Sequence, residues 1–345
     1  MKSVVLTARD VVELVDRPIP DLTDPHAIRV RVSATSICGS DIHLAAGHLT
    51  DELGFALGHE WVGVVDAVGA SINTLAVGDR VTGPAAPWCG ACEMCSARQS
   101  QRCVRGGVHG SGAFMGNLGG TQSEFLIVPW ADNCVIQVPE TVSDEAALTI
   151  GDVLSTGWTG VRHVLRPHLD TIVVIGCGPV GLSAVLAAKA EGIETIIAVD
   201  RVQQRLDLAL QLGATLTFVS GGDTAQASLS EFEHGVPAVV DAAGAQGSFD
   251  LAQAILGVGS SWAILGIPGT PITLDMTGLL MRNVSIWTGL GDLTHMSEIR
   301  DLIVNGAIDP TPLFTHRIAL DEAPAMYQRM ASGDTSVVKV LVTSD

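Results

Sequence analysis

Hydrophobic positions follow two different patterns along this chain, and the change between them predicts two kinds of domain. Residues 1–35 and 61–82 alternate apolar and polar side chains in short runs separated by proline and glycine, which is typical of strands joined by tight turns. From residue 171 the apolar runs are nearly continuous and alternate with helix-like segments. Buried parallel strands have this composition because helices cover both faces of their sheet.

The second pattern predicts a doubly wound parallel sheet, since strands and helices alternate at the intervals of βαβ units. We expect an α/β protein with a β-rich domain formed by residues 1–155 and 292–345, and a dinucleotide-binding domain formed by residues 156–291. The expected strands of the second domain are 171–175, 195–199, 216–219, 238–241, 261–265 and 284–287, and its expected helices are 182–191, 203–212 and 248–256.

Composition narrows the classes of function. The chain has 345 residues, of which 47% are hydrophobic, and a formal net charge of −18. An acidic surface repels phosphate backbones and anionic lipids, so neither nucleic acid nor a membrane is an expected partner. No apolar run reaches the roughly 18 residues that cross a bilayer, and residues 1–18 are acidic and strand-like rather than a signal peptide. We therefore expect a cytoplasmic protein.

Four of the seven cysteines lie within fifteen residues and form the pattern C-x2-C-x2-C-x7-C, namely Cys89, Cys92, Cys95 and Cys103. Four neighbouring thiolates fit a closed tetrahedral zinc site, which is structural because no position stays open for chemistry. Free core cysteines are one alternative, but the segment around them is polar. An iron–sulfur cluster is another, although its cysteine spacings differ.

A second group of possible metal ligands is spread along the chain. Cys38 begins the motif Cys-Gly-Ser-Asp, His59 and Glu60 follow a glycine, and so does Asp152. A cysteine, a histidine and a carboxylate are ligands that zinc accepts with one position left open for chemistry. The alternatives are an ordinary solvated His-Glu pair and, for Asp152, a helix N-cap.

The sequence Gly-Cys-Gly-Pro-Val-Gly follows the first continuous apolar run and opens a helix. In this context Gly176 makes a tight turn, Gly178 lets the backbone approach a pyrophosphate, and Gly181 lets helix and strand pack closely. Asp200 ends the next strand, where a carboxylate binds ribose hydroxyls and disfavours a 2′-phosphate. This favours NAD over NADP, although two nearby arginines could accommodate that phosphate, namely Arg201 and Arg205.

In this order the motifs resemble the zinc-dependent medium-chain dehydrogenase/reductase family, and within it the bacterial and secondary alcohol dehydrogenases. The resemblance spans nearly the whole chain and includes Gly-Asp-Arg-Val at 78–81. It implies a GroES-like catalytic domain, a Rossmann domain and two zinc ions per protomer. It also implies that Cys38, His59 and Asp152 bind the catalytic zinc, with Glu60 beside it or exchanging with water on it.

The resemblance implies an alcohol dehydrogenase in which zinc polarises the alcohol and hydride passes to C4 of the nicotinamide. Ser40 and His43 occupy the positions of the family's proton relay, and a plain surface histidine is the alternative for His43. Thr156 matches a nicotinamide contact, and Lys339 matches a cationic residue near the pyrophosphate. Further cofactor contacts are expected from Pro179, Val180, Ala243, Ile267 and Leu290.

Mostly apolar residues are candidates for the substrate pocket, which favours uncharged alcohols, ketones or aldehydes. They are Trp61, Ala86, Trp88, Phe114, Leu118, Trp158 and Leu290. A polyol, threonine or formaldehyde dehydrogenase on the same scaffold is the first alternative function, followed by a non-catalytic NAD- or zinc-binding protein and a zinc-free reductase. By analogy with the family we expect a homo-oligomer, a tetramer rather than a dimer, paired through 261–265, 284–287 and 289–291.

Overall fold

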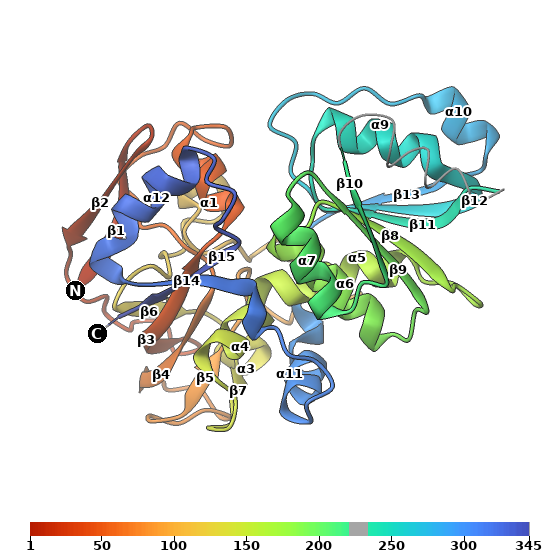
Figure 1. Ribbon diagram of the computed structural model, residues 1–345. Coiled ribbons are helices and arrows are strands. Elements are labelled where there is room, and N and C mark those ends of the chain that lie inside the picture. The colour runs from red at the N-terminus through yellow and green to blue at the C-terminus, as the bar shows by residue number, and fades with distance from the viewer. Residues whose placement is uncertain (221–233, 345) are drawn as a thin grey trace. The chain divides into compact units, whose positions relative to one another are not determined.

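The structure is a computed structural model that describes residues 1–220 and 234–344, and it divides the chain into two compact units (Figure 1). The β-rich unit contains Met1–Ser155, Asp292–Gly306 and Phe314–Asp345, and the parallel-sheet unit contains Thr156–Gly291 and Ala307–Leu313. The first two divisions fall after Ser155 and after Gly291. Residues 307–313 join the parallel-sheet unit because their short helix η5 (Thr311–Leu313) contacts α7 (Gln203–Leu212).

The β-rich unit contains a seven-stranded sheet with the order β14-β15-β3-β4-β5-β7, in which β6 also pairs with β3. The pairing is antiparallel except between β14 and β15. Strand β15, near the C-terminus, lies beside β3 from the N-terminal part of the chain (Figure 1). The strands are β3 (Ile28–Ile37), β4 (Trp61–Val68), β5 (Arg80–Thr82), β6 (Phe125–Val128), β7 (Ile136–Gln137), β14 (Phe314–Ala319) and β15 (Lys339–Thr343), with a separate hairpin of β1 (Lys2–Ala8) and β2 (Val11–Asp16).

Alternation along β3 builds the core of this unit. Ile28, Val30 and Val32 are buried against Trp61 and Leu126, and burial of each such side chain contributes about 1.5–3 kcal/mol. A second cluster lies under α1 and α12. The helical segments are α1 (Gly39–Ala45), α2 (Glu93–Ser96), η1 (Ser100–Arg102), η2 (Gly112–Met115), α3 (Ala131–Cys134), α4 (Asp144–Thr149), η3 (Ile150–Leu154), η4 (Leu293–His295), α11 (Met296–Val304), η6 (Leu320–Glu322) and α12 (Ala323–Ala331).

The parallel-sheet unit contains six parallel strands in the order β10-β9-β8-β11-β12-β13, which confirms the predicted doubly wound sheet. The strand order reverses between β8 and β11, and ligands of such sheets bind at the carboxyl ends of the strands near this point. The strands are β8 (Thr171–Ile175), β9 (Thr195–Asp200), β10 (Leu216–Val219), β11 (Val236–Asp241), β12 (Leu256–Ile264) and β13 (Ser285–Thr288), and the helices are α5 (Ser155–Val164), α6 (Pro179–Ala190), α7, α9 (Gln246–Ile255) and α10 (Met276–Met281).

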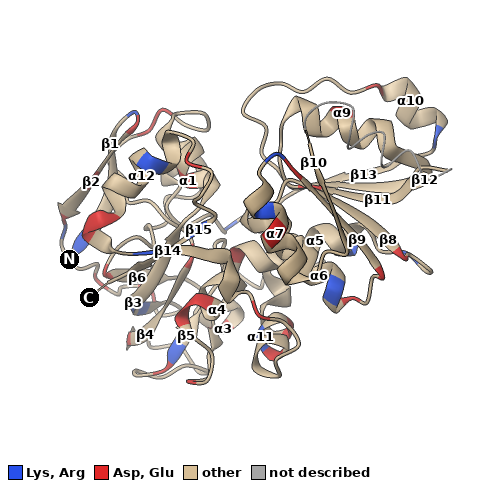
Figure 2. Ribbon diagram, viewed as in Figure 1, with Lys and Arg blue, Asp and Glu red and all other residues tan. Residues whose placement is uncertain are grey.

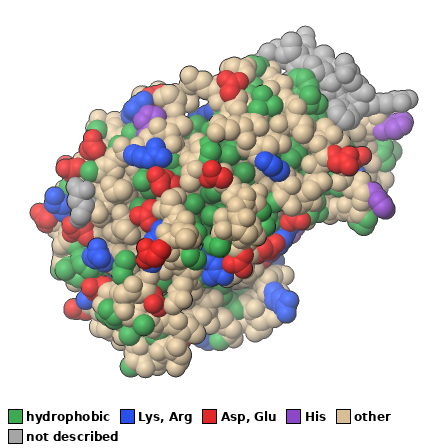
Figure 3. Space-filling model, turned by 60° about the horizontal axis from the view of Figure 1, so that its bottom comes forward, with side chains coloured by type: hydrophobic (Ala, Val, Ile, Leu, Met, Phe, Trp, Pro, Cys, Tyr) green, Lys and Arg blue, Asp and Glu red, His purple; other side chains and the backbone are tan. Residues whose placement is uncertain are grey.

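Charge on these six strands is confined to two of their carboxyl ends. Asp200 ends β9 and Asp241 ends β11, and the rest of the six strands carries no Lys, Arg, Asp or Glu (Figure 2). The charged side chains of these strands therefore lie only at the carboxyl ends of the strands. On the face drawn in Figure 3, basic side chains lie singly among acidic ones. In residues 1–220 and 234–344, no helix has both the length and the apolar character needed to cross a bilayer.

Candidate active site

The fold brings together four possible metal ligands of the β-rich unit from three separate segments. Cys38 lies between β3 and α1, His59 and Glu60 directly precede β4, and Asp152 lies in the short π-helix η3. One donor atom from each of the four lies within 4.8 Å of the others. Nε2 of His59 is 3.3 Å from Oδ2 of Asp152, and Sγ of Cys38 is 4.0 Å from the same oxygen.

Glycines make this convergence sterically feasible. Gly58 has a φ of +90°, and a Cβ there would lie 2.9 Å from the backbone nitrogen of Gln122. A Cβ on Gly151 would overlap the carbonyl oxygen of Gly83. Each glycine directly precedes a possible ligand, so the chain can approach its neighbour closely just where the ligand must enter the cluster. Asp152 lies within η3 rather than at the start of α5, so the N-cap alternative for this residue is wrong.

Asp41 orients the His59 ring from the side opposite the donor cluster. Its fully buried carboxylate lies 3.3 Å from Nδ1 of His59, which leaves Nε2 toward the cluster. Carboxylates hold metal-binding histidines in this way and select the ring nitrogen that binds the metal. Burial lowers the pKa of His59, but the Asp41 carboxylate, with Asp152 and Cys38, outweighs burial and raises that pKa well above its ordinary value. The carboxylates beside His59 therefore favour positive charge at this place, which suits a cation.

Asp41 also contacts the residue that caps α1. Cys38 is the N-cap of α1, and the Oδ2 atom of Asp41 accepts a hydrogen bond from its backbone nitrogen at 2.9 Å. Gln122 donates to the same oxygen at 3.3 Å. The Cys-Gly-Ser-Asp motif thus contains both a possible ligand and the residue that positions its neighbouring ligand, which the sequence pattern alone did not separate.

Glu60 and Lys339 form a buried ion pair beside the cluster. Both side chains are fully buried, and Nζ of Lys339 lies 2.6 Å from Oε2 of Glu60. Burial raises the pKa of Glu60 more than the ammonium lowers it. Burial lowers the pKa of Lys339, but the Glu60 carboxylate, together with Cys38 and Asp152, outweighs burial, and the pKa rises. The ammonium thus has a partner within the β-rich unit, and its expected contact with a pyrophosphate stays a prediction.

The donor chemistry of this cluster fits a zinc ion. A thiol, an imidazole and a carboxylate are ligands of zinc sites that keep a position open. The Oε1 atom of Glu60 is buried and has no hydrogen-bond partner among the described residues. An unpartnered buried carboxylate oxygen is costly unless a ligand satisfies it, so a cation at this place would also resolve an otherwise unsatisfied group.

The four-cysteine lobe forms a second compact donor set. One sulfur from each of Cys89, Cys92, Cys95 and Cys103 lies within 4.8 Å of the others. Sγ of Cys92 is 3.5 Å from that of Cys95 and 3.9 Å from that of Cys103. Zn–S bonds of about 2.3 Å in a tetrahedron place sulfurs about 3.8 Å apart. Backbone hydrogen bonds from Cys95 and Val104 lower the pKa of Cys92 to about 6, which favours the thiolate that binds metal.

The glycine motif has the close approaches that a dinucleotide site requires. A Cβ on Gly181 would overlap the carbonyl oxygen of Gly176, whereas a Cβ on Gly178 would meet no atom within 4 Å. Gly178 is the N-cap of α6 and Pro179 is its first residue, so the helix begins three residues before the predicted start. Free N–H groups at such a helix terminus bind phosphates.

Asp200 lies beside this motif, as its expected ribose-binding role requires. Its Oδ2 atom accepts a hydrogen bond from the backbone nitrogen of Cys177 at 2.6 Å, and Oδ1 accepts one from Val202 at 2.8 Å. Arg201 is exposed and Arg205 is partly buried. The residues therefore fit an adenine dinucleotide, with the carboxylate fixed next to the glycine turn by backbone donors.

The other expected cofactor residues of this unit differ in exposure. Thr156 lies against Gly291, since a Cβ on that glycine would be 2.6 Å from its Oγ1 atom. Ala243 packs against Gly176, where a Cβ would be 2.8 Å from its backbone nitrogen. Val180, at the start of α6, is partly buried. Ile267 and Leu290 are exposed, with 42% and 48% of their surface accessible.

Two expected pocket residues belong to the core. Trp61 and Trp158 are each 1% exposed, so their assignment to a substrate pocket is wrong and packing explains them. Trp88 is partly buried against the core around β3. Phe114, on η2, is 50% exposed. Ala86 and Leu118 are partly buried, and a role for them at the substrate stays a prediction.

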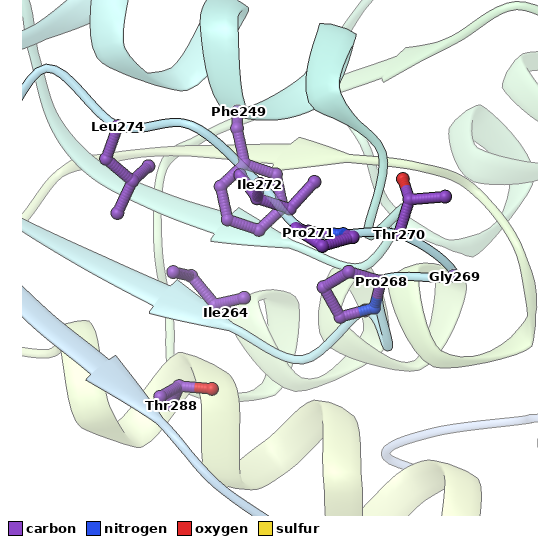
Figure 4. Close-up of a pocket in the computed structure, with 10 residues that line it drawn as sticks. Phe249, Ile264, Pro268, Gly269, Thr270, Pro271, Ile272, Leu274 and Thr288 are labelled. Carbon is purple, nitrogen blue, oxygen red and sulfur yellow. The ribbon is translucent and has the colours of Figure 1, made fainter. Parts of the chain in front are cut away.

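A hollow of about 530 Å³ lies in the parallel-sheet unit at the carboxyl ends of β12 and β13 (Figure 4). Phe249 and Ile264 face it, and the loop after β12 closes one side through Ile272 and Leu274. Its lining contains no charged residue and none of the expected metal ligands. This hollow is therefore distinct from the metal-binding candidates.

Family models match both parts of the chain. The alcohol dehydrogenase GroES-like domain matches residues 24–140, and the zinc-binding dehydrogenase domain matches residues 179–303. An alcohol dehydrogenase of Cupriavidus necator is 30% identical over 360 residues, covering 99% of this chain and 98% of its own. An L-threonine 3-dehydrogenase of Bacillus subtilis is 31% identical over 339 residues, covering 94% of this chain and 93% of its own.

Solved structures agree with these sequence matches. An alcohol dehydrogenase from Thermus sp. ATN1 has a TM-score of 0.93 and 34% identity, with 100% of both chains covered. An alcohol dehydrogenase from Escherichia coli, complexed with NADH, has a TM-score of 0.89 and 26% identity over 99% of both chains. A protein assigned as a zinc-binding dehydrogenase from Sinorhizobium meliloti, bound to NADP, has a TM-score of 0.87 and 26% identity over 99% of this chain and 98% of its own.

The fold and the donor sets define a zinc-dependent oxidoreductase of the alcohol dehydrogenase type, with a nicotinamide cofactor. The chain belongs to the zinc-dependent medium-chain dehydrogenase/reductase family, as its resemblance indicated. The predicted combination of a GroES-like domain with a Rossmann domain is confirmed.

Proposed function

We propose that the protein is an NAD-linked dehydrogenase of small uncharged alcohols, acting also as a carbonyl reductase, with one catalytic and one structural zinc. The observation that carries this proposal is the convergence of Cys38, His59 and Asp152, with a carboxylate behind the histidine. Two donor sets of different composition support two metal sites, because four thiols form a closed site and a mixed set leaves a position open.

The chain's own residues have distinct parts in this chemistry. When bound at the mixed donor set, zinc supplies Lewis-acid polarisation of the substrate oxygen, and the nicotinamide supplies the hydride acceptor. Asp41 holds His59 with Nε2 toward the donor set. Lys339 holds one oxygen of Glu60 and leaves the other unpartnered. Ser40 and His43, both on α1 directly after Cys38, would carry the alcohol proton away from the site.

Asp200 supports NAD as the cofactor. Backbone donors fix its carboxylate beside the glycine turn, where it can accept ribose hydroxyls and repel a 2′-phosphate. Relatives of this fold bind either NADH or NADP, so the preference depends on this chain's own residues. Arg201 and Arg205 act against this preference, because an arginine here can bind a 2′-phosphate.

We also propose that the protein is a homo-oligomer, with a tetramer as the expected state. Strand β13 is the last strand in the described order of the parallel sheet. Its Ile286 is 38% exposed, and the preceding helix α10 exposes Leu280 (71%) and Met281 (72%). A sheet edge with apolar neighbours favours pairing with a second copy. The cytoplasmic location stays a prediction.

The decisive experiment measures zinc per protomer together with NAD-dependent oxidation of primary, secondary and polyhydroxy alcohols. We expect two zinc ions and turnover of simple alcohols. Cys38→Ala should remove one zinc and abolish turnover, whereas Cys134→Ala, at a buried cysteine outside both donor sets, should keep both zinc ions. One zinc and no turnover in the unmodified protein would favour a non-catalytic binding protein.

A dehydrogenase of a polyhydroxy or amino alcohol is the second candidate. The observation favouring it is the 31% identity to an L-threonine 3-dehydrogenase across most of the chain. The metal chemistry would be the same, and only the pocket would differ. Turnover of threonine or of a polyol at least tenfold faster, by kcat/KM, than that of simple alcohols would select this candidate.

A further inference from the structure

The C-terminal end of α1 places His48 beside His43. His43 is the residue expected to carry the alcohol proton away from the site. Helix α1 ends at Ala45, and Gly47 follows with a φ of +69°. The backbone nitrogen of Gly47 donates to the oxygen of Leu44 at 3.0 Å, and that of His48 donates to the oxygen of His43 at 3.0 Å. This pair of bonds is the Schellman ending of a helix, which needs a residue with positive φ.

The helix ending places the two imidazoles in contact. Nδ1 of His43 lies 3.1 Å from Nδ1 of His48, and the ring centroids are 5.4 Å apart. At this distance one nitrogen must donate a hydrogen and the other must accept it. His43 is half-buried whereas His48 is exposed. The pair therefore connects a partly enclosed ring to one that meets solvent.

The charges around the pair come from the turn between β1 and β2 and from the loop after α1. Arg9 donates to the carbonyl oxygen of Gly47 at 3.2 Å and pairs with Asp51 at 3.6 Å. The backbone nitrogen of Asp10 donates to Ala45 at 2.8 Å. Burial and the neighbouring His48 lower the pKa of His43, so this ring is neutral at ordinary pH and can accept a proton.

We propose that His48 is the outer proton acceptor of the enzyme and releases to water the proton that reaches His43. The proposal rests on the proposed alcohol oxidation, which must export one proton per turnover. A proton arriving at Nε2 of His43 displaces the proton on Nδ1, which passes to Nδ1 of His48. His48 then releases the proton on its own Nε2 to water, so the number of protons on the pair is unchanged.

His48 acts through His43, so its test needs a signal that packing alone would not change. Stopped-flow mixing with NAD and alcohol, with a pH indicator in weak buffer, measures proton release beside NADH formation. We expect His48→Gln to slow proton release roughly threefold to tenfold at pH 6–7, less than the 10²–10⁴ of direct general catalysis. Added imidazole should restore the rate. His26→Gln, at an exposed histidine of the same unit, is the matched control.

A second measurement needs no turnover. In the NMR titration of His43, His48→Gln should raise the pKa of the His43 ring, because His48 lowers it in the unmodified protein. Proton release and a His43 titration that both match those of His26→Gln would overturn the proton path while leaving the dehydrogenase intact. Absence of NAD-dependent turnover in the unmodified protein would overturn the proposed function and this path together.

Discussion

The buried Glu60–Lys339 pair provides a sharp test of how the candidate metal site is supported. Both side chains are fully buried and their charged atoms are 2.6 Å apart. The informative variants are Lys339→Met, which keeps the length of the side chain, Glu60→Gln, and the two together. Each single variant leaves one polar partner buried without its counterpart, whereas the double variant removes both charges.

The expected magnitude follows from the geometry. Two unit charges 2.6 Å apart attract by about 6 kcal/mol at an effective dielectric of about 20, but desolvation offsets much of this. Breaking a buried pair by removing one partner costs about 3–5 kcal/mol, while replacing both partners is often nearly neutral. Since each kcal/mol shifts Tm by about 2–4 °C for a domain of 150–250 residues, Lys339→Met should lower Tm by about 6–20 °C.

Calorimetry on protein with a measured and equal zinc content is the appropriate assay, because metal loss would also lower Tm. The double variant should recover most of the loss. If Lys339→Met melts within about 2 °C of the unmodified protein, or if the two single losses simply add in the double variant, the pair does not carry the coupling that its burial implies.

Three further predictions concern the cofactor, the lobe and the parallel sheet. Asp200→Gly should raise the ratio of kcat/KM for NADP over NAD roughly tenfold or more, as removal of about 1.4 kcal/mol of discrimination would; an unchanged ratio would contradict the ribose role. Cys95→Ser should lower Tm and zinc content, because structural zinc binding contributes to folding, and should change kcat less; the reverse order would make the lobe catalytic. Burial raises the pKa of Asp241 above its ordinary 3.8, so its stabilising contribution is complete below that pH and is lost as pH rises through the raised pKa. The unmodified protein should therefore lose stability relative to Asp241→Asn in urea denaturation as the pH rises above the ordinary pKa of 3.8, and a pH-independent difference would refute this.

Local patterns were enough to predict the two kinds of domain and two of the candidate sites. The continuous apolar runs after residue 171 predicted a parallel sheet, because such strands are buried on both faces, and the sheet is parallel throughout. The four cysteines lie within fifteen residues, so their spacing already limits how far apart the sulfurs can be. The same holds for the glycine turn and Asp200, which belong to one βαβ unit.

Long-range contacts were decided only by the tertiary structure. Cys38 and Asp152 are 114 positions apart, and Glu60 and Lys339 are 279 apart, so no sequence period relates them, and only residue type and the family resemblance indicated the first pair. Lys339 reaches Glu60 because β15 pairs with β3. Asp41 faces His59, and Trp61 fills the core rather than a pocket. Side-chain type and helix or strand period specify which face is buried, whereas partners across a sheet depend on strand order and register, which the chain acquires only on folding.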